Sequence, residues 1–208
     1  MPMKTLGLLA VGWVAGLAST GCAGHKAAAP APASTGTAQG TPIHPPATDA
    51  EQVQAYDLHR SGKPDVWVYS VTSQDASGKS TERRVRKEAD LNGDGKVDIV
   101  YWFDADGQVT RETMDLDFDG KVDDTLFFEK GKKVRSEKDL DGDGRVDTWS
   151  YYDGSEKLVR KERDVKGTGK VDYWEYWEAG VIDRIGEDLD GDGQVDRWTK
   201  GGEAAATK

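Results

Sequence analysis

An acidic segment of nine residues recurs along this chain of 208 residues, and its residue types are those that bind hard metal ions. Its clearest copy, residues 139–147, reads Asp-Leu-Asp-Gly-Asp-Gly-Arg-Val-Asp. Side-chain oxygens at positions 1, 3, 5 and 9, around a Gly at position 6 that permits a sharp turn, are typical of a calcium loop. We number the six copies as loops 1 to 6, at residues 57–65, 90–98, 115–123, 139–147, 164–172 and 188–196.

Four of the copies, loops 2, 3, 4 and 6, have Asp or Asn at all four side-chain positions. The main-chain carbonyl of position 7 is expected to complete each cage. A simple Asp-Gly turn is the alternative reading of such segments, but four complete copies favour calcium. The predicted Ca²⁺ ligands are Asp90, Asn92, Asp94, Lys96 and Asp98 in loop 2; Asp115, Asp117, Asp119, Lys121 and Asp123 in loop 3; Asp139, Asp141, Asp143, Arg145 and Asp147 in loop 4; and Asp188, Asp190, Asp192, Gln194 and Asp196 in loop 6.

Loops 1 and 5 are degenerate and are expected to hold no calcium. Loop 1 has His59 and Ser61 at positions 3 and 5, which leaves too few carboxylates. Loop 5 has Lys166 and Thr168 at the same positions. We expect the Lys166 ammonium to take the place of the ion in loop 5.

The loops resemble those of EF-hands as far as position 9, but the bidentate Glu of an EF-hand at position 12 is absent. Tyr101, Leu126, Ser150 and Thr199 stand there instead. The acidic loops are more similar to the Asp-x-Asp-x-Asp-Gly-x-x-Asp loops of thrombospondin type-3 repeats and to the FG-GAP loops of integrin-like propellers. That resemblance covers the loops alone, and it implies calcium sites that stiffen a fold.

The segments between the loops predict an all-β fold. From loop 2 onward the copies start at residues 90, 115, 139, 164 and 188, and such a fixed period indicates a repeat architecture. Position 11 is often Trp and position 13 is aromatic in five copies, and a Gly turn follows, which favours β-hairpins. We predict an antiparallel meander of about a dozen strands over residues 51–200. Open sheet, solenoid and barrel closure are all compatible with this pattern.

Two further features concern the faces of the strands. Positions 9, 11 and 13 share one face, because side chains alternate along a strand, and this aromatic face is the expected buried side. An arginine also lies four residues before each of the last five loops, and it could belong to a solvated charge row or to a ladder stacked on aromatic rings. Its recurrence favours the ladder: Arg86, Arg111, Arg135, Arg160 and Arg184.

The N-terminus predicts export and lipid attachment. Lys4 and the apolar run 6–18 precede Ser19-Thr20-Gly21-Cys22, which resembles the lipobox of bacterial lipoproteins, with Ser19 in place of the usual Leu. Residues 1–21 would be a signal peptide. Membership of that family implies a diacylglyceryl thioether and an N-acyl chain such as palmitate on Cys22, the single cysteine, with Ala23 favouring the outer membrane. Residues 22–50 are predicted to be an Ala/Pro/Thr-rich disordered tether and residues 201–208 a disordered tail.

Charge and composition narrow the function. Removal of residues 1–21 takes away one lysine, so the net charge becomes 27 − 38 = −11. Such an acidic body argues against nucleic acid as a partner and fits cation binding. The sequence favours a non-enzymatic lipoprotein of the bacterial cell envelope, anchored in a membrane, with a structural or adhesive role toward another surface protein. The alternative is a carbohydrate-binding module that recognises cell-wall polysaccharide with its Trp and Tyr rows.

Overall fold

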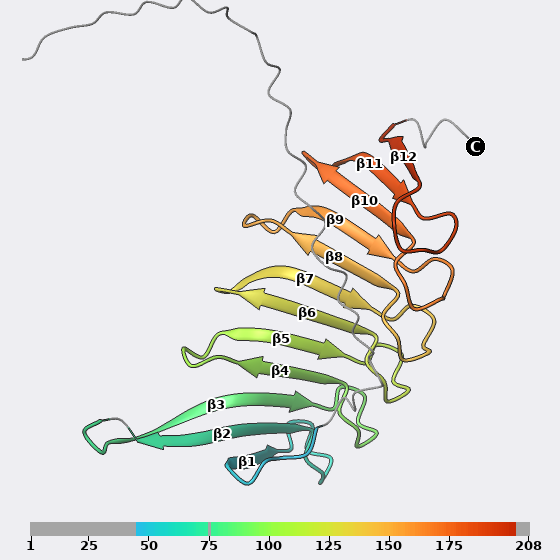
Figure 1. Ribbon diagram of the computed structural model, residues 1–208. Helices are drawn as coiled ribbons and strands as arrows, with labels where there is room; N and C mark the ends of the chain where they lie inside the picture. The colour runs from blue at the N-terminus through green and yellow to red at the C-terminus, as the bar shows by residue number, and fades with distance from the viewer. Residues whose placement is uncertain (1–44, 75, 203–208) are drawn as a thin grey trace, which may run out of the picture. The chain divides into compact units, whose positions relative to one another are not determined.

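The fold is a single antiparallel sheet of twelve strands, paired in the order of the sequence (Figure 1). The computed structural model describes residues 45–74 and 76–202. The two edge strands of the sheet remain unpaired to each other, so the sheet is open, and the predicted all-β meander is confirmed. The strands are β1 (Glu51–Tyr56), β2 (Val66–Gln74), β3 (Ser80–Ala89), β4 (Ile99–Phe103), β5 (Val109–Met114), β6 (Asp124–Glu129), β7 (Lys132–Lys138), β8 (Thr148–Tyr152), β9 (Leu158–Arg163), β10 (Tyr173–Glu178), β11 (Val181–Glu187) and β12 (Arg197–Lys200).

Two kinds of connection alternate along the sheet. The acidic loops follow the odd-numbered strands, and tight turns close the hairpins at the opposite strand ends (Figure 1). In the turn Lys130-Gly131 both residues have positive φ, 51° and 75°, as a two-residue type I′ turn requires. Asp153 stabilises a longer turn, where its side chain accepts the N–H groups of Ser155 at 2.7 Å and Lys157 at 3.0 Å.

A β-bulge follows position 13 in every hairpin. The pairing register shifts directly after five aromatic residues, and a bulge at each repeat adds to the local right-handed twist. The shifts come after Tyr69, Trp102, Phe127, Tyr151 and Tyr176.

The predicted arginine ladder is confirmed. Each ladder arginine pairs in register with the position-13 aromatic residue of the preceding strand, and its guanidinium carbon lies 3.7–4.6 Å from the ring centroid. Such stacking is favourable because the ring face is electronegative. We call the side of the sheet that carries this row the arginine face; the row is Tyr69, Arg86, Trp102, Arg111, Phe127, Arg135, Tyr151, Arg160, Tyr176 and Arg184.

A second row on the arginine face runs beside the ladder, two residues nearer to the loops. In this row, residues at position 11 of the repeat alternate with residues that lie two places after a ladder arginine. Three of the residues that follow an arginine are glutamates. Glu88, Glu137 and Glu162 each contact the arginine of their own strand at 3.1–3.2 Å. Glu88 is completely buried and also accepts a 2.8 Å hydrogen bond from the Tyr69 hydroxyl. Because these charges are paired, the face tolerates their burial.

The apolar core is small. Val97 and Val100 are buried together, with Trp67, Trp102 and Val122 packed against them. Val97 and Val122, at position 8 of loops 2 and 3, therefore anchor these loops against the arginine face. The aromatic side is only partly buried: Tyr69 and Trp174 are buried, whereas Trp198 in β12 is 51% exposed. Among the described residues, no helix has the length and apolar character needed to cross a membrane.

The predicted signal peptide 1–21, Cys22 and most of the predicted tether 22–50 lie outside the described residues. The same holds for residues 203–208 of the predicted tail.

Candidate metal centres

The six loops lie side by side where the odd-numbered strands end, and main-chain hydrogen bonds join neighbouring loops. The position-9 N–H of each loop donates to the carbonyl of the residue before position 1, as Asp147 does to Lys138 at 2.8 Å. The position-1 N–H of the next loop then donates to the position-9 carbonyl, as Asp164 does to Asp147 at 2.9 Å. These bonds continue the strand pairing into the loops, so positions 1 and 9 are fixed by the sheet.

The carboxylates at positions 1 and 9 also organise the loop main chain, with or without a metal. In loop 4, Asp139 accepts the N–H groups of Gly142 at 2.8 Å and Gly144 at 2.7 Å. Asp147 closes the loop by accepting the Leu140 N–H at 2.7 Å. Carboxylates that accept main-chain N–H groups at such distances form strong, charge-assisted hydrogen bonds.

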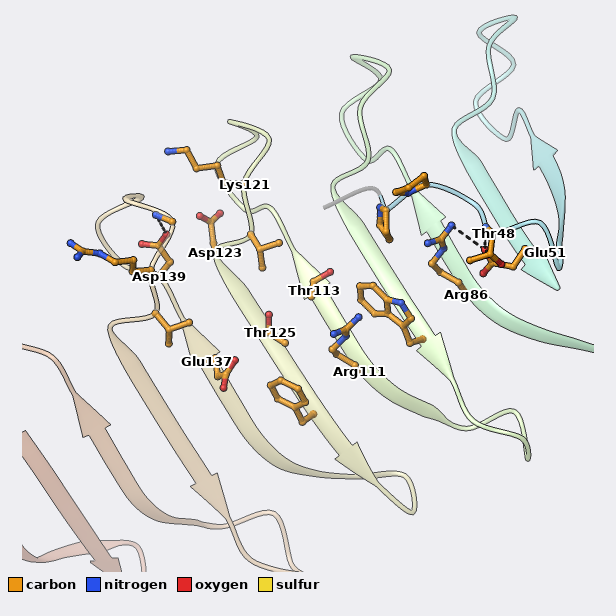
Figure 2. A pocket seen from close by; sticks show the side chains of 18 residues that line it. Thr48, Glu51, Arg86, Arg111, Thr113, Lys121, Asp123, Thr125, Glu137 and Asp139 are labelled. Carbon is orange, nitrogen blue, oxygen red and sulfur yellow. Dashed lines mark hydrogen bonds and ion pairs between the residues drawn. The ribbon is translucent and has the colours of Figure 1, made fainter. Parts of the chain in front are cut away.

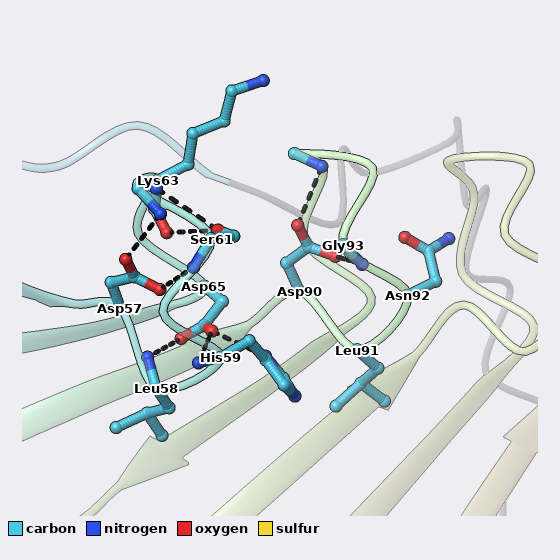
Figure 3. A network of polar contacts seen from close by, with 12 residues as sticks. Asp57, Leu58, His59, Ser61, Lys63, Asp65, Asp90, Leu91, Asn92 and Gly93 are labelled. Atoms are coloured by element: carbon cyan, nitrogen blue, oxygen red, sulfur yellow. Dashed lines mark hydrogen bonds and ion pairs between the residues drawn. The ribbon is translucent and has the colours of Figure 1, made fainter.

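The degenerate loops keep this same main-chain scaffold. In loop 1, Asp57 accepts from Ser61 and Gly62 at 2.9 and 2.8 Å, and Asp65 accepts from Leu58 at 2.9 Å (Figure 3). Positions 1, 6 and 9 are therefore common to all six loops because folding of the loop requires them. Positions 3 and 5 are what distinguish the four complete loops.

Position 3 brings a third carboxylate to the other two. In loops 3, 4 and 6, one oxygen each from positions 1, 3 and 9 lies within 4.8 Å of the others. A calcium ion with ligands at about 2.3–2.6 Å has a coordination sphere roughly 5 Å across, so the three oxygens could share one ion. These metal-compatible groups are Asp115, Asp117 and Asp123; Asp139, Asp141 and Asp147; and Asp188, Asp190 and Asp196.

Loop 2 has the same scaffold with an amide at position 3. Asp90 accepts from Gly93 at 2.6 Å and from Gly95 at 2.8 Å (Figure 3). Asn92 offers an amide oxygen, which currently accepts the Asp94 N–H at 2.8 Å. This loop therefore offers two carboxylates and one neutral oxygen at positions 1, 9 and 3.

The position-5 carboxylates do not belong to the groups of three. Asp119 contacts the Lys121 ammonium at 3.2 Å, and Asp143 accepts from Nε of Arg145 at 2.8 Å. The main-chain and side-chain N–H groups of Lys121 lower the pKa of Asp119, and the Arg145 guanidinium lowers that of Asp143. Ligation by position 5 and by the position-7 carbonyl stays a prediction.

Electrostatics differ between the three groups. Burial raises the pKa of Asp115, and burial together with the neighbouring Asp141 and Asp139 raises the pKa of Asp147. In loop 6, burial also tends to raise the pKa of Asp188. The main-chain N–H donors and the Lys166 ammonium have the larger combined effect, so the pKa of Asp188 is lowered. Crowded carboxylates in loops 3 and 4 thus favour a cation as a partner.

The prediction that the Lys166 ammonium takes the place of the ion in loop 5 is wrong. The Nζ of Lys166 donates to the carbonyl of Asp188 at 2.7 Å, in loop 6. The side chain is long enough to reach the adjacent loop, and the partial negative charge of that carbonyl attracts it. In loop 1 the position-3 side chain is engaged as well, since Nδ1 of His59 lies 2.6 Å from Asp65.

Comparison with known proteins adds little to this geometry. No family model and no curated protein matches the chain. Among solved structures, accessory secretory protein 1, 2 and 3 of Streptococcus pneumoniae matches at a TM-score of 0.33 with 16% identity over 64% of this chain. A TarM mutant of S. aureus, in complex with Fondaparinux, alpha-GlcNAc-glycerol and UDP, matches at 0.33 with 14% identity over 51%. The matches cover only 20% and 19% of those chains, and such scores carry no argument.

Proposed function

We propose that this protein is a non-enzymatic scaffold whose repeat body is stiffened by calcium in loops 2, 3, 4 and 6. The convergence of three carboxylates in loops 3, 4 and 6 is the observation that supports the proposal best. Position 3 supplies the third carboxylate in these loops, and it is one of the two positions, with position 5, at which the degenerate loops 1 and 5 differ. Loops 1 and 5 thus serve as internal controls for metal binding by loops 2, 3, 4 and 6.

The chemistry of the donor set favours calcium over other metals. Carboxylate, amide and carbonyl oxygens suit hard cations, and no histidine or cysteine belongs to the three groups. Magnesium demands a small octahedral cage and retains several waters, whereas calcium accepts six to eight oxygens in a flexible arrangement. Four Ca²⁺ ions would carry eight positive charges against the net charge of 27 − 38 = −11 that remains without residues 1–21.

Calorimetric titration of the purified full-length chain with Ca²⁺ tests the metal. We expect four ions with dissociation constants on the order of 10⁻⁴–10⁻³ M, as in other extracellular modules, and weaker binding of Mg²⁺. A stoichiometry of zero or one would contradict the assignment of the loops.

The arginine face supports a structural role for the repeat body. Its aromatic rings are stacked against arginines at 3.7–4.6 Å, so they stabilise the sheet and are not presented as one open platform for sugar rings. We propose that the body spaces or supports another surface protein of the bacterial cell envelope.

Attachment to the membrane would come from Cys22, which follows the lipobox-like segment 19–22. The Cys22→Ser variant should leave the membrane fraction or remain unprocessed. If this variant is processed and fractionates like the wild-type protein, the lipoprotein assignment is wrong, while the calcium proposal is unaffected.

A further inference from the structure

Two positions interrupt the alternation of arginine and glutamate on the arginine face, Thr113 in β5 and Gly186 in β11. Glutamate follows Arg86, Arg135 and Arg160 by two residues and contacts each of them at 3.1–3.2 Å. Thr113 stands at that place after Arg111 in β5. The carboxylate that neutralises three of the sister arginines is therefore missing here.

The neighbours of Thr113 are small as well. In register with it lie Val100 of β4 and Thr125 of β6, at positions where four other repeats have Trp. The row therefore changes from large to small side chains over three consecutive strands. A cavity of about 400 Å³ opens there, a volume within the usual range of ligand pockets.

The cavity lies on the arginine face, with Arg111, Thr113 and Thr125 on adjacent strands (Figure 2). The Arg111 guanidinium stacks on Trp102 at 3.7 Å, and Phe127 lies in register on its other side. Val122 and Val146 from loops 3 and 4 add apolar surface to the wall. The cavity thus places the Arg111 guanidinium between aromatic rings and beside the apolar side chains of Val122 and Val146.

Arg111 is the charged residue of this wall without a polar partner. The wall has four cationic and four acidic side chains, and within the described part of the chain only Arg111 makes neither a hydrogen bond nor an ion pair. The other seven are held by partners: Arg86, Lys121, Arg145, Glu51, Asp123, Glu137 and Asp139. Glu137 faces the cavity from β7. Its carboxylate contacts Arg135 at 3.1 Å, and its charge also acts on Arg111 without an ion-pair contact.

Thr113 presents a second unsatisfied group. Its side chain is 7% exposed, and its hydroxyl has no hydrogen-bond partner among the described residues. A buried hydroxyl without a partner costs free energy, so a ligand that hydrogen-bonds to it is favoured.

We propose that this cavity binds a small apolar carboxylic acid, whose carboxylate takes the place of the missing glutamate beside Arg111. Arginine suits a carboxylate because its planar donors match the two oxygens. The Thr113 hydroxyl donates a further hydrogen bond to that carboxylate. The apolar part of the acid packs against Val122 and Val146. The inference does not rest on the calcium proposal, although Asp123 and Asp139 of loops 3 and 4 also line the cavity.

Titration of the full-length protein with benzoate and with hexanoate, followed by saturation-transfer NMR, tests the proposal. We expect one site with a dissociation constant on the order of 1 mM for at least one acid, and binding at least tenfold weaker for uncharged benzamide, because a hydrogen bond to a charged group is lost. Absence of binding by both acids, or equal binding of benzamide, would overturn the proposal.

Two variants locate the site. Thr113→Glu restores the glutamate of the sister repeats, so the chain should fold and melt at least as high as wild type while binding falls by about 10–100-fold. Arg197→Gln alters an exposed arginine of β12 outside the cavity and should leave the affinity unchanged. Wild-type affinity in Thr113→Glu, with the melting temperature retained, would show that the acid binds elsewhere.

Discussion

Loop 4 allows the scaffold role of a carboxylate to be separated from its role in binding a metal. Asp141 at position 3 belongs to the group of three, and its side chain accepts the Asp143 N–H at 3.1 Å on the surface. Asp147 at position 9 belongs to the same group but also accepts the Leu140 N–H. Asp172, at position 9 of the degenerate loop 5, accepts two N–H groups at 2.9 Å.

These contacts predict that the effect of Asp141→Ala depends on calcium and that the effect of Asp172→Ala does not. In chelator, Asp147→Ala and Asp172→Ala should each lower the free energy of unfolding by about 1 kcal/mol, as for loss of a capping carboxylate. Asp141→Ala should change it by less than about 0.5 kcal/mol, as for an exposed site. At 10 mM Ca²⁺ and a dissociation constant of about 10⁻⁴–10⁻³ M, one bound ion stabilises the native state by roughly 1.4–2.7 kcal/mol.

Thermal unfolding of the three variants and the wild type, each in calcium and in chelator, measures this difference. Loss of one ion corresponds to about 3–10 °C for a chain of this size. Asp141→Ala should therefore lose several degrees in calcium only, and Asp172→Ala should lose the same amount under both conditions. If Asp141→Ala melts like wild type in calcium, or if its loss persists in chelator, then position 3 has no role in binding a metal.

Three further predictions concern the arginine face and protons. Glu162→Gln removes the buried charge partner of Arg160 and should lower the free energy of unfolding by about 3–5 kcal/mol in urea titrations. Glu178→Gln, at an exposed position, should have almost no effect, and equal effects of the two variants would contradict the ladder. Burial and the hydrogen bond to a carboxylate raise the pKa of Tyr69 to about 12, and burial also raises the pKa values of Tyr101, Tyr151 and Tyr173, so Tyr69→Phe should remove one of the late tyrosine steps in an ultraviolet titration. Because burial raises the pKa values of Asp115 and Asp147, protons compete with calcium there, and calorimetry should find weaker binding at pH 5 than at pH 7; an unchanged affinity would argue against these sites.

The repeat architecture could be predicted from sequence because its signals are local. Alternating side chains, aromatic residues and Gly turns specify hairpins within about 25 residues, and the recurrence of the loops gives the same answer several times. The arginine ladder was predictable for the same reason, since Arg86 and its sisters keep a constant distance from each loop. The groups of three carboxylates also follow from spacing within one loop.

Features that depend on pairing between strands required the tertiary structure. The backbone bond from the Asp164 N–H to the Asp147 carbonyl ties loop 5 to loop 4. The carboxylates of Asp164 and Asp172 accept main-chain N–H groups of loop 5, which explains why they persist there without calcium chemistry. The reach of Lys166 into loop 6, like the bond between Asp164 and Asp147, joins two loops. Both contacts involve residues of neighbouring loops, whose separation is set by the sheet and not by the chain between them.

The cavity beside Arg111 shows most clearly which features follow from the sequence and which depend on the tertiary structure. Val100, Thr113 and Thr125 are visible in the sequence as departures from the repeat, but they are 12–13 residues apart and on three different strands. Only the register of β4, β5 and β6 places them side by side, and Thr113 and Thr125 then line a cavity. The sequence by itself determined the repeat and its loops, because those signals lie within single segments; the tertiary structure decided where the repeat leaves space, because space depends on side chains that meet across strands.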